Sequence, residues 1–374
     1  MEKKKITYYS LDILKFICAL IIACIYHYYN DFEYVFPFSR FPGFHFLVDY
    51  GYLFVELFFI ISGFLFYLNY FPKIKQKIKF SDFFIKRYSR LIPVVIITSI
   101  VMFLLQQSYY LFFQEFWMWG DNDFSNLILQ MTGLRYWFVP TTSLNNAVWY
   151  ISVLLFCYII FYFITKLVIK KKNKWIFFLS LLVILTIKYS SIPLPFFNLF
   201  MIRGMVSFSI GIIFGCFFVK VKNFTKPLLI SFINILLFLV LYGVFHVQVL
   251  GEMYIYTNFF LFPSILLFCL SLEEKIKRKE NTKINRVIKY FGSLSFGIFV
   301  WNLPIQCGTV LIDRVFDLNL NYGSWEIFLL QFIIHIMFAM MNHHIIENHV
   351  NPFFEKRIST LFLNCNKMMK NNRM

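Results

Sequence analysis

The chain of 374 residues has few charged side chains and is poor in acidic ones. Charged residues make up only 15% of the sequence, hydrophobic residues make up 59%, and the mean hydropathy is +0.66. A soluble domain needs more polar surface than this, so the composition excludes one and predicts a polytopic membrane protein. In such a protein the 52 phenylalanines and 23 tyrosines are expected to face lipid more often than a cofactor.

Three further absences narrow the class of protein. The seven cysteines form no C-x-x-C pair and mostly lie in apolar runs, so we interpret them as small hydrophobic residues, not a disulfide or metal framework. No small-residue cleavage site follows the first apolar run, so that run is expected to be a retained span and not a signal peptide. No internal repeat or low-complexity linker divides the chain, and no second soluble domain is expected.

The excess of basic residues, 36 against 19 acidic ones, gives a formal net charge of +17. Such an excess is also typical of nucleic-acid-binding proteins. Here, however, the basic residues form short clusters between apolar runs, where they set the orientation of membrane spans. We therefore expect membrane lipids, and no nucleic acid, among the partners.

Ten apolar runs approach the length of about 20 residues that a membrane-spanning helix needs. They fall near residues 8–29, 47–71, 89–110, 144–166, 174–190, 199–219, 228–247, 254–272, 287–309 and 325–347. The predicted fold class is therefore all-α, with about ten transmembrane helices within residues 1–350 and a short basic tail over residues 351–374.

The charges of the loops alternate along this series of runs. Basic clusters occur at Lys3–Lys5, Lys73–Arg87, Lys170–Lys174, Lys220–Lys226, Lys275–Arg286 and Lys356–Arg373. The intervening loops are acidic or nearly neutral. Because basic loops remain in the cytoplasm, both termini and the tail are expected to be cytoplasmic. The longest outer loop, Tyr110–Ser143, is rich in Trp and Phe and either lies on the membrane surface or covers a site.

The first run contains a lysine and a histidine, Lys15 and His27, with no charged residue between them. Ionisable groups at membrane depth are costly and persist mostly where a cavity, a partner or a reaction needs them. A histidine can gain or lose a proton near neutral pH. His27 is therefore either a group that takes part in chemistry or an interfacial histidine near the outer helix end, and Lys15 is either functional or extends to the headgroups.

Six segments resemble motifs of one family, the integral-membrane acyltransferase-3 proteins that O-acetylate bacterial cell-surface glycans. In chain order they are Leu11–His27, Val55–Phe64, Phe84–Pro93 (similar to the family's R-x-x-R-x-x-P turn), Trp149–Val153, Leu294–Trp301 and Ile346–Pro352. They occur in the family's order over nearly the whole chain. The resemblance implies a membrane acyltransferase domain over residues 1–350.

The chain departs from the family's pattern at two places. Eleven residues separate Lys15 from His27, where the family usually has ten. One extra residue rotates the second side chain by about 100° around an α-helix, so either the helix carries a π-bulge or Lys15 is not the functional counterpart. In addition, Asn302 stands where the family often has a histidine, so no second histidine is predicted at that position.

The resemblance also implies roles for particular residues. His27 would be a general base that takes the proton of a sugar hydroxyl as it attacks a thioester, and neutral imidazole suits that task. Glu56 would orient a catalytic group, and Ser62 is either catalytic or, with Gly63, a packing contact. The acceptor site would include Trp149 and Asn302.

The donor would be acetyl-CoA or another acyl-CoA, held by Lys15, Arg87 and Arg90. The two arginines lie three residues apart and either anchor the helix or bind phosphates in bidentate pairs. Glu347 either caps a helix end or lines the donor mouth. Its spacing from His343 and His344 permits a metal, but no further ligand cluster follows, so no metal is predicted.

The function expected from these residues is transfer of an acyl group from cytoplasmic acyl-CoA to a surface or lipid-linked glycan. The expected location is the bacterial cytoplasmic membrane, with one polar cavity formed by spans one, two, three, four and nine. A separate extracytoplasmic protein is expected if final delivery needs another chain. The alternatives are a carrier or flippase for a lipid-linked saccharide and a structural subunit of a glycan-export complex, neither of which transfers an acyl group.

Overall fold

The structure is a computed structural model in which every regular element is a helix. It describes residues 8–32, 45–118, 120, 122–139, 141, 144–189, 196–221, 231–233, 235–236, 254, 257–277 and 283–371. These residues contain no strand. The predicted class, an all-α polytopic membrane protein, is confirmed.

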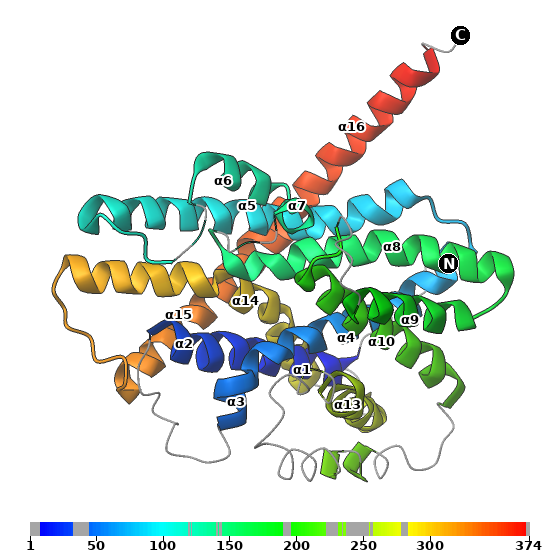
Figure 1. The fold of residues 1–374 in the computed structure, drawn as a ribbon, viewed down its shortest axis with the longest axis horizontal. Helices are drawn as coiled ribbons and strands as arrows, with labels where there is room; N and C mark the ends of the chain where they lie inside the picture. Colours follow the sequence, from blue (N-terminus) through cyan, green and yellow to red (C-terminus); the bar gives the residue numbers. More distant parts are fainter. Residues whose placement is uncertain are drawn as a thin grey trace. The chain divides into compact units, whose positions relative to one another are not determined.

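The described helices follow one another along the chain in the order shown in Figure 1. They are α1 (Tyr9–Leu20), the π-helix η1 (Ile21–His27), α2 (Tyr28–Phe32), α3 (His45–Tyr50), the 3-10 helix η3 (Gly51–Leu53), α4 (Phe54–Lys75), α5 (Phe80–Phe113), α6 (Phe124–Met131), α7 (Arg135–Phe138), the 3-10 helix η4 (Asn146–Val148), α8 (Trp149–Lys171), α9 (Trp175–Tyr189), α10 (Leu199–Val221), the π-helix η5 (Thr257–Leu261), α13 (Phe262–Lys277), α14 (Lys283–Val315), α15 (Trp325–Met341), the π-helix η6 (Asn342–Val350) and α16 (Asn351–Asn371).

Seven helical stretches are long and apolar enough to cross a bilayer. They are Tyr9–Asn30, His45–Lys75, Phe80–Phe113, Asn146–Lys171, Leu199–Phe218, Lys283–Val315 and Trp325–Asn364, and each overlaps one of the predicted runs. Two further runs correspond to shorter apolar helices, Trp175–Ile187 and Thr257–Glu273. The run at 228–247 lies mostly outside the described residues. Ten spans, and the cytoplasmic location of both termini, therefore stay predictions.

The chain forms two compact units. Unit 1 comprises Met1–Gln76 and Phe163–Ser295, and unit 2 comprises Lys77–Tyr162 and Phe296–Met374. The division into units falls inside α8 and α14 and does not coincide with the predicted end of the transmembrane domain at residue 350.

Within unit 1, α4 and α10 lie side by side (Figure 1). A Cβ atom at Gly63 would meet the carbonyl oxygen of Phe208, and one at Gly211 would meet the carbonyl oxygen of Ile60. Two glycines thus let the two backbones touch, which is how small residues hold membrane helices together without a hydrophobic driving force.

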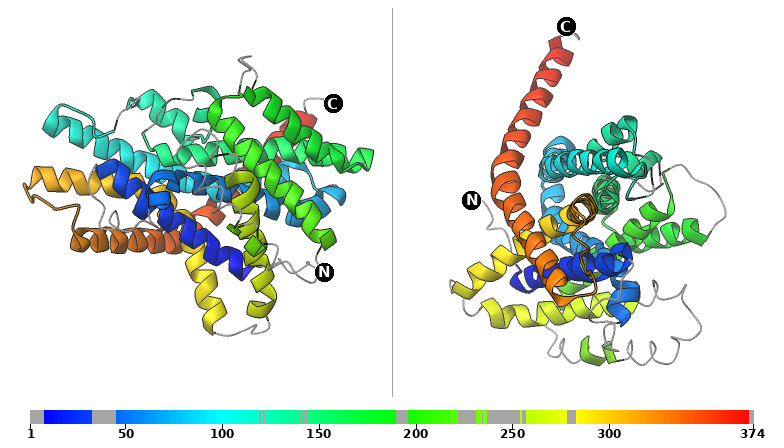
Figure 2. Two further views of the ribbon diagram at one scale, coloured as in Figure 1. Left: turned by 60° about the horizontal axis from the view of Figure 1, so that its bottom comes forward. Right: turned by 90° about the vertical axis from the view of Figure 1, so that its left-hand side faces the viewer.

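Also within unit 1, α1 packs against α13 (Figure 2). The buried carboxylate of Glu273 accepts hydrogen bonds from the Tyr9 and Ser10 backbone N–H groups, at 3.0 and 2.9 Å, and from Ser10 Oγ at 2.7 Å. A carboxylate here satisfies N–H groups that the first turn of a helix leaves without partners. Glu273 therefore fixes the start of the helix that carries Lys15.

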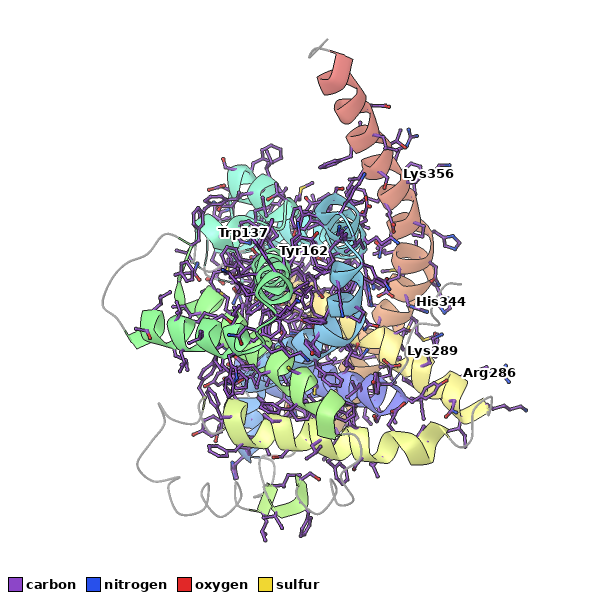
Figure 3. The ribbon with its side chains drawn as sticks, turned by 90° about the vertical axis from the view of Figure 1, so that its right-hand side faces the viewer. Trp137, Tyr162, Arg286, Lys289, His344 and Lys356 are labelled. Carbon is purple, nitrogen blue, oxygen red and sulfur yellow. The ribbon has the colours of Figure 1, made fainter. Side chains whose placement is uncertain are left out.

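Unit 2 contains α5 to α7, the first part of α8, the later part of α14 and the helices that follow it. Tyr162 on α8 (labelled in Figure 3) donates a 2.7 Å hydrogen bond to the carbonyl of Ile78, just before α5. α16 packs on α5, where Asn351 Nδ2 donates to the Arg90 carbonyl at 3.0 Å. The backbone at Gly297 on α14 closely approaches Ala339 on α15. Each of these contacts involves α5, α8 or α14, the helices that carry Arg87, Arg90, Trp149 and Asn302.

The Phe84–Pro93 segment is not the turn that the sequence resemblance implied. It lies inside α5, which begins at Phe80 and includes Pro93. Residues 80–92 contain no glycine or proline, so the helix propagates through them, and Pro93 disturbs only the turn before it by removing one hydrogen bond. Arg87 and Arg90 are consequently held on a regular helix.

The described part of the outer loop Tyr110–Ser143 contains α6 and α7. Asp123 caps α6 by accepting from Asn126 N at 2.7 Å, a bond that lowers the pKa of its carboxyl group below its ordinary value. The buried Arg135 donates to Asn126 Oδ1 at 3.2 Å and to the Thr141 carbonyl at 2.8 Å. Polar contacts therefore connect α6 to α7 and Thr141 within the described part of this loop.

The predicted topology is tested by reporter fusions on either side of α8. We expect alkaline phosphatase to be active when fused at Gly120 and inactive when fused at Lys172, because the basic loop after α8 is predicted to be cytoplasmic and the loop before it to lie outside. A green fluorescent protein fused at the same two positions should give the opposite pattern. Equal phosphatase activity at both positions would contradict the topology.

Candidate functional site

His27 ends the π-helix η1, which interrupts the helix that begins with α1. A π turn closes with an i→i+5 hydrogen bond and so accommodates one residue more than an α turn. It therefore absorbs the extra residue between Lys15 and His27 and brings the two positions back to one side of the helix. Of the two explanations for the unusual spacing, the structure contains the π-bulge. The roles of Lys15 and His27 themselves stay predictions.

Deleting a residue from η1 tests this explanation of the spacing. We expect deletion of Cys24 to convert the π turn to an α turn and to change the unfolding temperature only modestly, because later residues keep their orientation. Insertion of one alanine between Ile17 and Cys18, in regular α-helix, rotates the buried Tyr28 and Phe32 out of place, at a cost of about 3–5 kcal/mol for each. Thermal unfolding in detergent measures both variants. An equal loss of stability would contradict the assignment of the extra residue to η1.

Lys15 forms an ion pair with Asp12, one turn earlier on α1, with a 2.7 Å distance between Nζ and Oδ1. Both side chains are mostly buried, 25% and 17% exposed. The positive charge of Lys15 is therefore paired with a carboxylate within the segment Leu11–His27.

The imidazole of His27 is partly exposed and contacts aromatic rings. The Tyr26 ring lies edge-on to it with 5.2 Å between centroids, and the Tyr52 ring is 5.5 Å from that of Tyr26. The guanidinium carbon of Arg203 lies 5.7 Å from the centre of the Tyr52 ring. Two tyrosines thus lie between His27 and Arg203 in unit 1.

Arg203 forms a buried ion pair with Glu56. Its Nε and Nη2 atoms lie 2.7 and 2.5 Å from Glu56 Oε1, and the Glu56 side chain is fully buried. The Arg203 carbonyl accepts from Tyr254 at 3.1 Å and from Ser207 at 3.0 Å. Sequence reasoning selected Glu56 but missed Arg203. The signal was available, because Arg203 is the only charged residue within the run 199–219 and opposite charges at membrane depth tend to pair.

Ser62 lies on α4, two turns after Glu56, and is half-buried. Its neighbour Gly63 makes the close contact with α10. The packing alternative is thus confirmed for Gly63, while a catalytic role of Ser62 stays a prediction.

Arg87 and Arg90 occupy one face of α5, as their spacing predicted, but their surroundings differ. Arg87 is half-buried, and its guanidinium carbon lies 5.0 Å from the centre of the Tyr158 ring. Arg90 is exposed, and its backbone carbonyl accepts the bond from Asn351. Arg87 is therefore oriented by an aromatic face, while the Arg90 side chain is accessible to solvent or a ligand.

Trp149 and Asn302 lie on segments that contact each other in unit 2. Next to Trp149, the Tyr150 ring packs against Phe299 with 5.6 Å between centroids. Just before α8, Asn145 Nδ2 donates to the Val300 carbonyl at 3.1 Å. Trp149 and Asn302 are 8% and 1% exposed. The start of α8 is therefore attached to the part of α14 that carries Asn302.

Asn302 contacts a histidine that sequence reasoning missed. His335, on α15, is 1% exposed and places Nε2 3.2 Å from Asn302 Oδ1 and Nδ1 2.7 Å from the Gln331 carbonyl. A carbonyl oxygen only accepts hydrogen bonds, so Nδ1 of His335 carries a proton. The orientation of the Asn302 amide, with its oxygen or its NH2 group toward Nε2, follows from whether Nε2 is also protonated. Position 302 is an asparagine and not a histidine, but His335 on α15 lies next to it. His335 lies in the middle of its apolar run, before His343 and His344, and this was a signal comparable to that of His27.

Glu347 lies in η6 and bonds to residues on the same π-helix. Its Oε2 is 3.2 Å from His343 Nδ1, and its Oε1 accepts from Asn342 Nδ2 at 3.2 Å. Trp301 on α14 donates to Asn342 Oδ1 at 3.3 Å. His344 is exposed and points away from the ribbon (Figure 3). In the described part of the chain, no group of three or more His, Cys, Asp or Glu side chains is arranged to bind a metal.

The predicted residues thus fall into two groups. Lys15, His27, Glu56 and Ser62 belong to unit 1, and the others (Arg87, Arg90, Trp149, Asn302 and Glu347) belong to unit 2. A protein-family model described as an acyltransferase domain matches residues 8–344, a range that includes every predicted site residue except Glu347. Comparisons with curated proteins and with solved structures find no match.

Proposed function

The chain belongs to the acyltransferase-3 family, and we propose that this membrane acyltransferase moves an acyl group, most simply acetyl, from acyl-CoA to a glycan hydroxyl. The acceptor is a cell-surface or lipid-linked glycan, and the enzyme resides in the bacterial cytoplasmic membrane. The observation that carries the proposal is the π-helix η1, which ends on the partly exposed His27 and returns it to the side of the helix that carries Lys15.

In the proposed reaction His27 is the general base. Its neutral imidazole takes the proton of the acceptor hydroxyl as that oxygen attacks the thioester carbonyl. The new C–O bond forms an ester, the C–S bond breaks, and the CoA thiolate leaves and takes up a proton to give the free thiol. The reaction requires no metal and no redox step.

The donor is bound through its phosphates. Arg87 and Arg90 present two guanidinium groups three residues apart on α5, and guanidinium groups donate to phosphate in bidentate pairs. The packing of Arg87 on Tyr158 limits its motion, which lowers the entropy that phosphate binding would cost. Lys15 contributes a further positive charge from α1.

The proposed reaction is tested with the purified full-length protein in nanodiscs. Acetyl-CoA and a lipid-linked or soluble glycan are added, and free thiol is measured with a colorimetric thiol reagent. The glycan is then analysed by mass spectrometry for the added mass of an acetyl group. We expect thiol release that depends on the acceptor. Transport of the saccharide without thiol release would favour the carrier alternative. Comparison of surface glycans from wild-type and deletion strains identifies the natural acceptor.

The arginine pair gives a prediction on donor affinity. Replacing Arg87 and Arg90 with glutamine should raise the KM for acyl-CoA about tenfold or more for each arginine, because a hydrogen bond to a charged group contributes about 1.5–3 kcal/mol. The effect on kcat should be smaller, since phosphate binding is common to ground and transition states. Steady-state kinetics measures both constants.

Lys86 provides a matched control for this experiment. It precedes Arg87 directly, is exposed, and carries the same charge at the same end of α5. Lys86→Gln should leave the KM near the wild-type value. If the double arginine variant inserts normally and also keeps the wild-type KM, the two arginines only anchor the helix.

A further inference from the structure

The C-terminal helix α16 extends beyond what is needed to cross a membrane. α15 contains 17 residues, or about 26 Å at 1.5 Å per residue, and the hydrocarbon core is about 30 Å thick. α15 and part of η6 therefore suffice for the crossing. α16 adds 21 residues, or about 32 Å, and continues as a single helix past its contact with α5 (Figure 1).

α16 is amphipathic where its side chains are described. Phe354, Ile358, Leu361 and Phe362 follow the i, i+4, i+7, i+8 pattern of one helical face. Leu361 and Phe362 are 63% and 50% exposed. α16 contacts α5 at its start, where Asn351 is buried. Later in the helix, at Leu361 and Phe362, the apolar face is exposed.

Outside this apolar face α16 carries a basic pair, together with Phe353 and Leu363, which are 60% and 62% exposed. Lys356 and Arg357 are exposed, and Lys356 points outward in Figure 3. After Glu355 the sequence contains five basic residues and no acidic one. A helix that combines exposed apolar residues, basic residues and low net hydrophobicity is too polar to span a bilayer and too apolar to remain in water.

We propose that α16 lies on the membrane surface, with its apolar face in the headgroup boundary and its basic residues against anionic lipid headgroups. The helix leaves the bilayer next to that surface, so the surface is within reach. The π-helix η6 and Pro352 are features at which a helix can change direction. Charges of one sign favour an anionic leaflet over a second protein, whose surface usually carries both signs.

This inference does not rest on the proposed function. The family match ends at residue 344, before α16 begins, and the surface position requires no acyl donor or acceptor. It changes the interpretation of residues 351–374 from a tail to a lipid-binding element that is attached, through Asn351, to the helix carrying Arg90.

The experiment places a genetically encoded fluorescent amino acid at Phe362 or at Thr360 in the full chain. These positions are two residues apart, so they point to nearly opposite sides of the helix, and both are exposed. The protein is studied in nanodiscs of phosphatidylcholine alone and in nanodiscs with 30% phosphatidylglycerol, roughly the anionic content of a cytoplasmic leaflet. Brominated lipid and aqueous iodide serve as quenchers.

In the anionic nanodiscs we expect brominated lipid to quench the probe at Phe362 and iodide to quench the probe at Thr360. Neutral lipid should weaken the difference. The variant Lys356→Gln/Arg357→Gln should shift the equilibrium away from the lipid by about fivefold for each basic residue removed. Lys86→Gln, a change of one exposed charge on α5, is the control and should have no effect.

Three outcomes would overturn the proposal. Equal quenching of both probes by iodide would place α16 in water. Equal quenching by brominated lipid would make it part of a span. Protection of the Phe362 probe from both quenchers, irrespective of lipid charge, would mean that protein covers this face, either a second copy of the chain or another partner.

Discussion

Replacing His27 with alanine is expected to lower kcat by two to four orders of magnitude, while the KM for acyl-CoA stays near the wild-type value. A positioned general base typically contributes a factor of 10²–10⁴, and its effect appears in the transition state and not in donor binding. The measurement is steady-state thiol release in nanodiscs over a range of acyl-CoA concentrations at saturating acceptor.

Two further variants make this result specific. His27→Gln keeps a polar side chain of similar size, so it separates loss of the base from loss of packing around Tyr26. His344→Ala removes an exposed histidine on η6 and should change neither constant. Full activity of His27→Ala would remove the assigned base, and His335 would then be the histidine to replace next.

Most of the fold was predictable from the sequence because membrane spans are specified locally. Hydropathy over about 20 residues and the charges of the flanking loops need no knowledge of neighbouring helices. The π-helix η1 was also predictable from local sequence. The one extra residue between Lys15 and His27 predicted either a π-bulge or a Lys15 that is not the functional counterpart. The turn over Phe84–Pro93 was implied by the resemblance to a family motif and is wrong, because the segment lies inside the helix α5.

The partners of the site residues were not predictable in this way. Arg203 was visible as the single charged residue of its apolar run, and His335 as an ionisable residue in the middle of another. Which helices become neighbours, however, depends on packing that periodicity does not encode. The α4–α10 contact depends on Gly63 and Gly211, each of which alone resembles any glycine in a span. The amphipathic pattern of α16 was present in the sequence, but the basic charge alone led to its prediction as a tail.

The second large effect is expected at the ion pair between Glu56 and Arg203. Replacing Arg203 with methionine should destabilise the protein by about 3–5 kcal/mol, because it leaves the fully buried Glu56 carboxylate without its counter-charge. Glu56→Gln should cost a similar amount by isolating the arginine. Thermal unfolding in detergent, followed by size-exclusion chromatography, measures the loss.

The pair between Arg314 and Glu115 provides the control. It has a similar N–O distance, 2.8 Å, but its side chains are 50% and 59% exposed. Exposed ion pairs contribute about 0–1 kcal/mol, so Arg314→Met should have little effect on stability. If Arg203→Met were as mild as Arg314→Met, Glu56 would have to be neutral in the folded protein.

The double variant Glu56→Gln/Arg203→Met separates stability from function. Removing both charges leaves no isolated ion, so the double variant should recover most of the stability that either single change loses. Its activity then decides the role of the pair. Restored stability with restored acyl transfer would make the pair purely structural. Restored stability with a low kcat would mean that Glu56 and Arg203 act on the reaction, and the position of Tyr52 and Tyr26 between Arg203 and His27 provides the route.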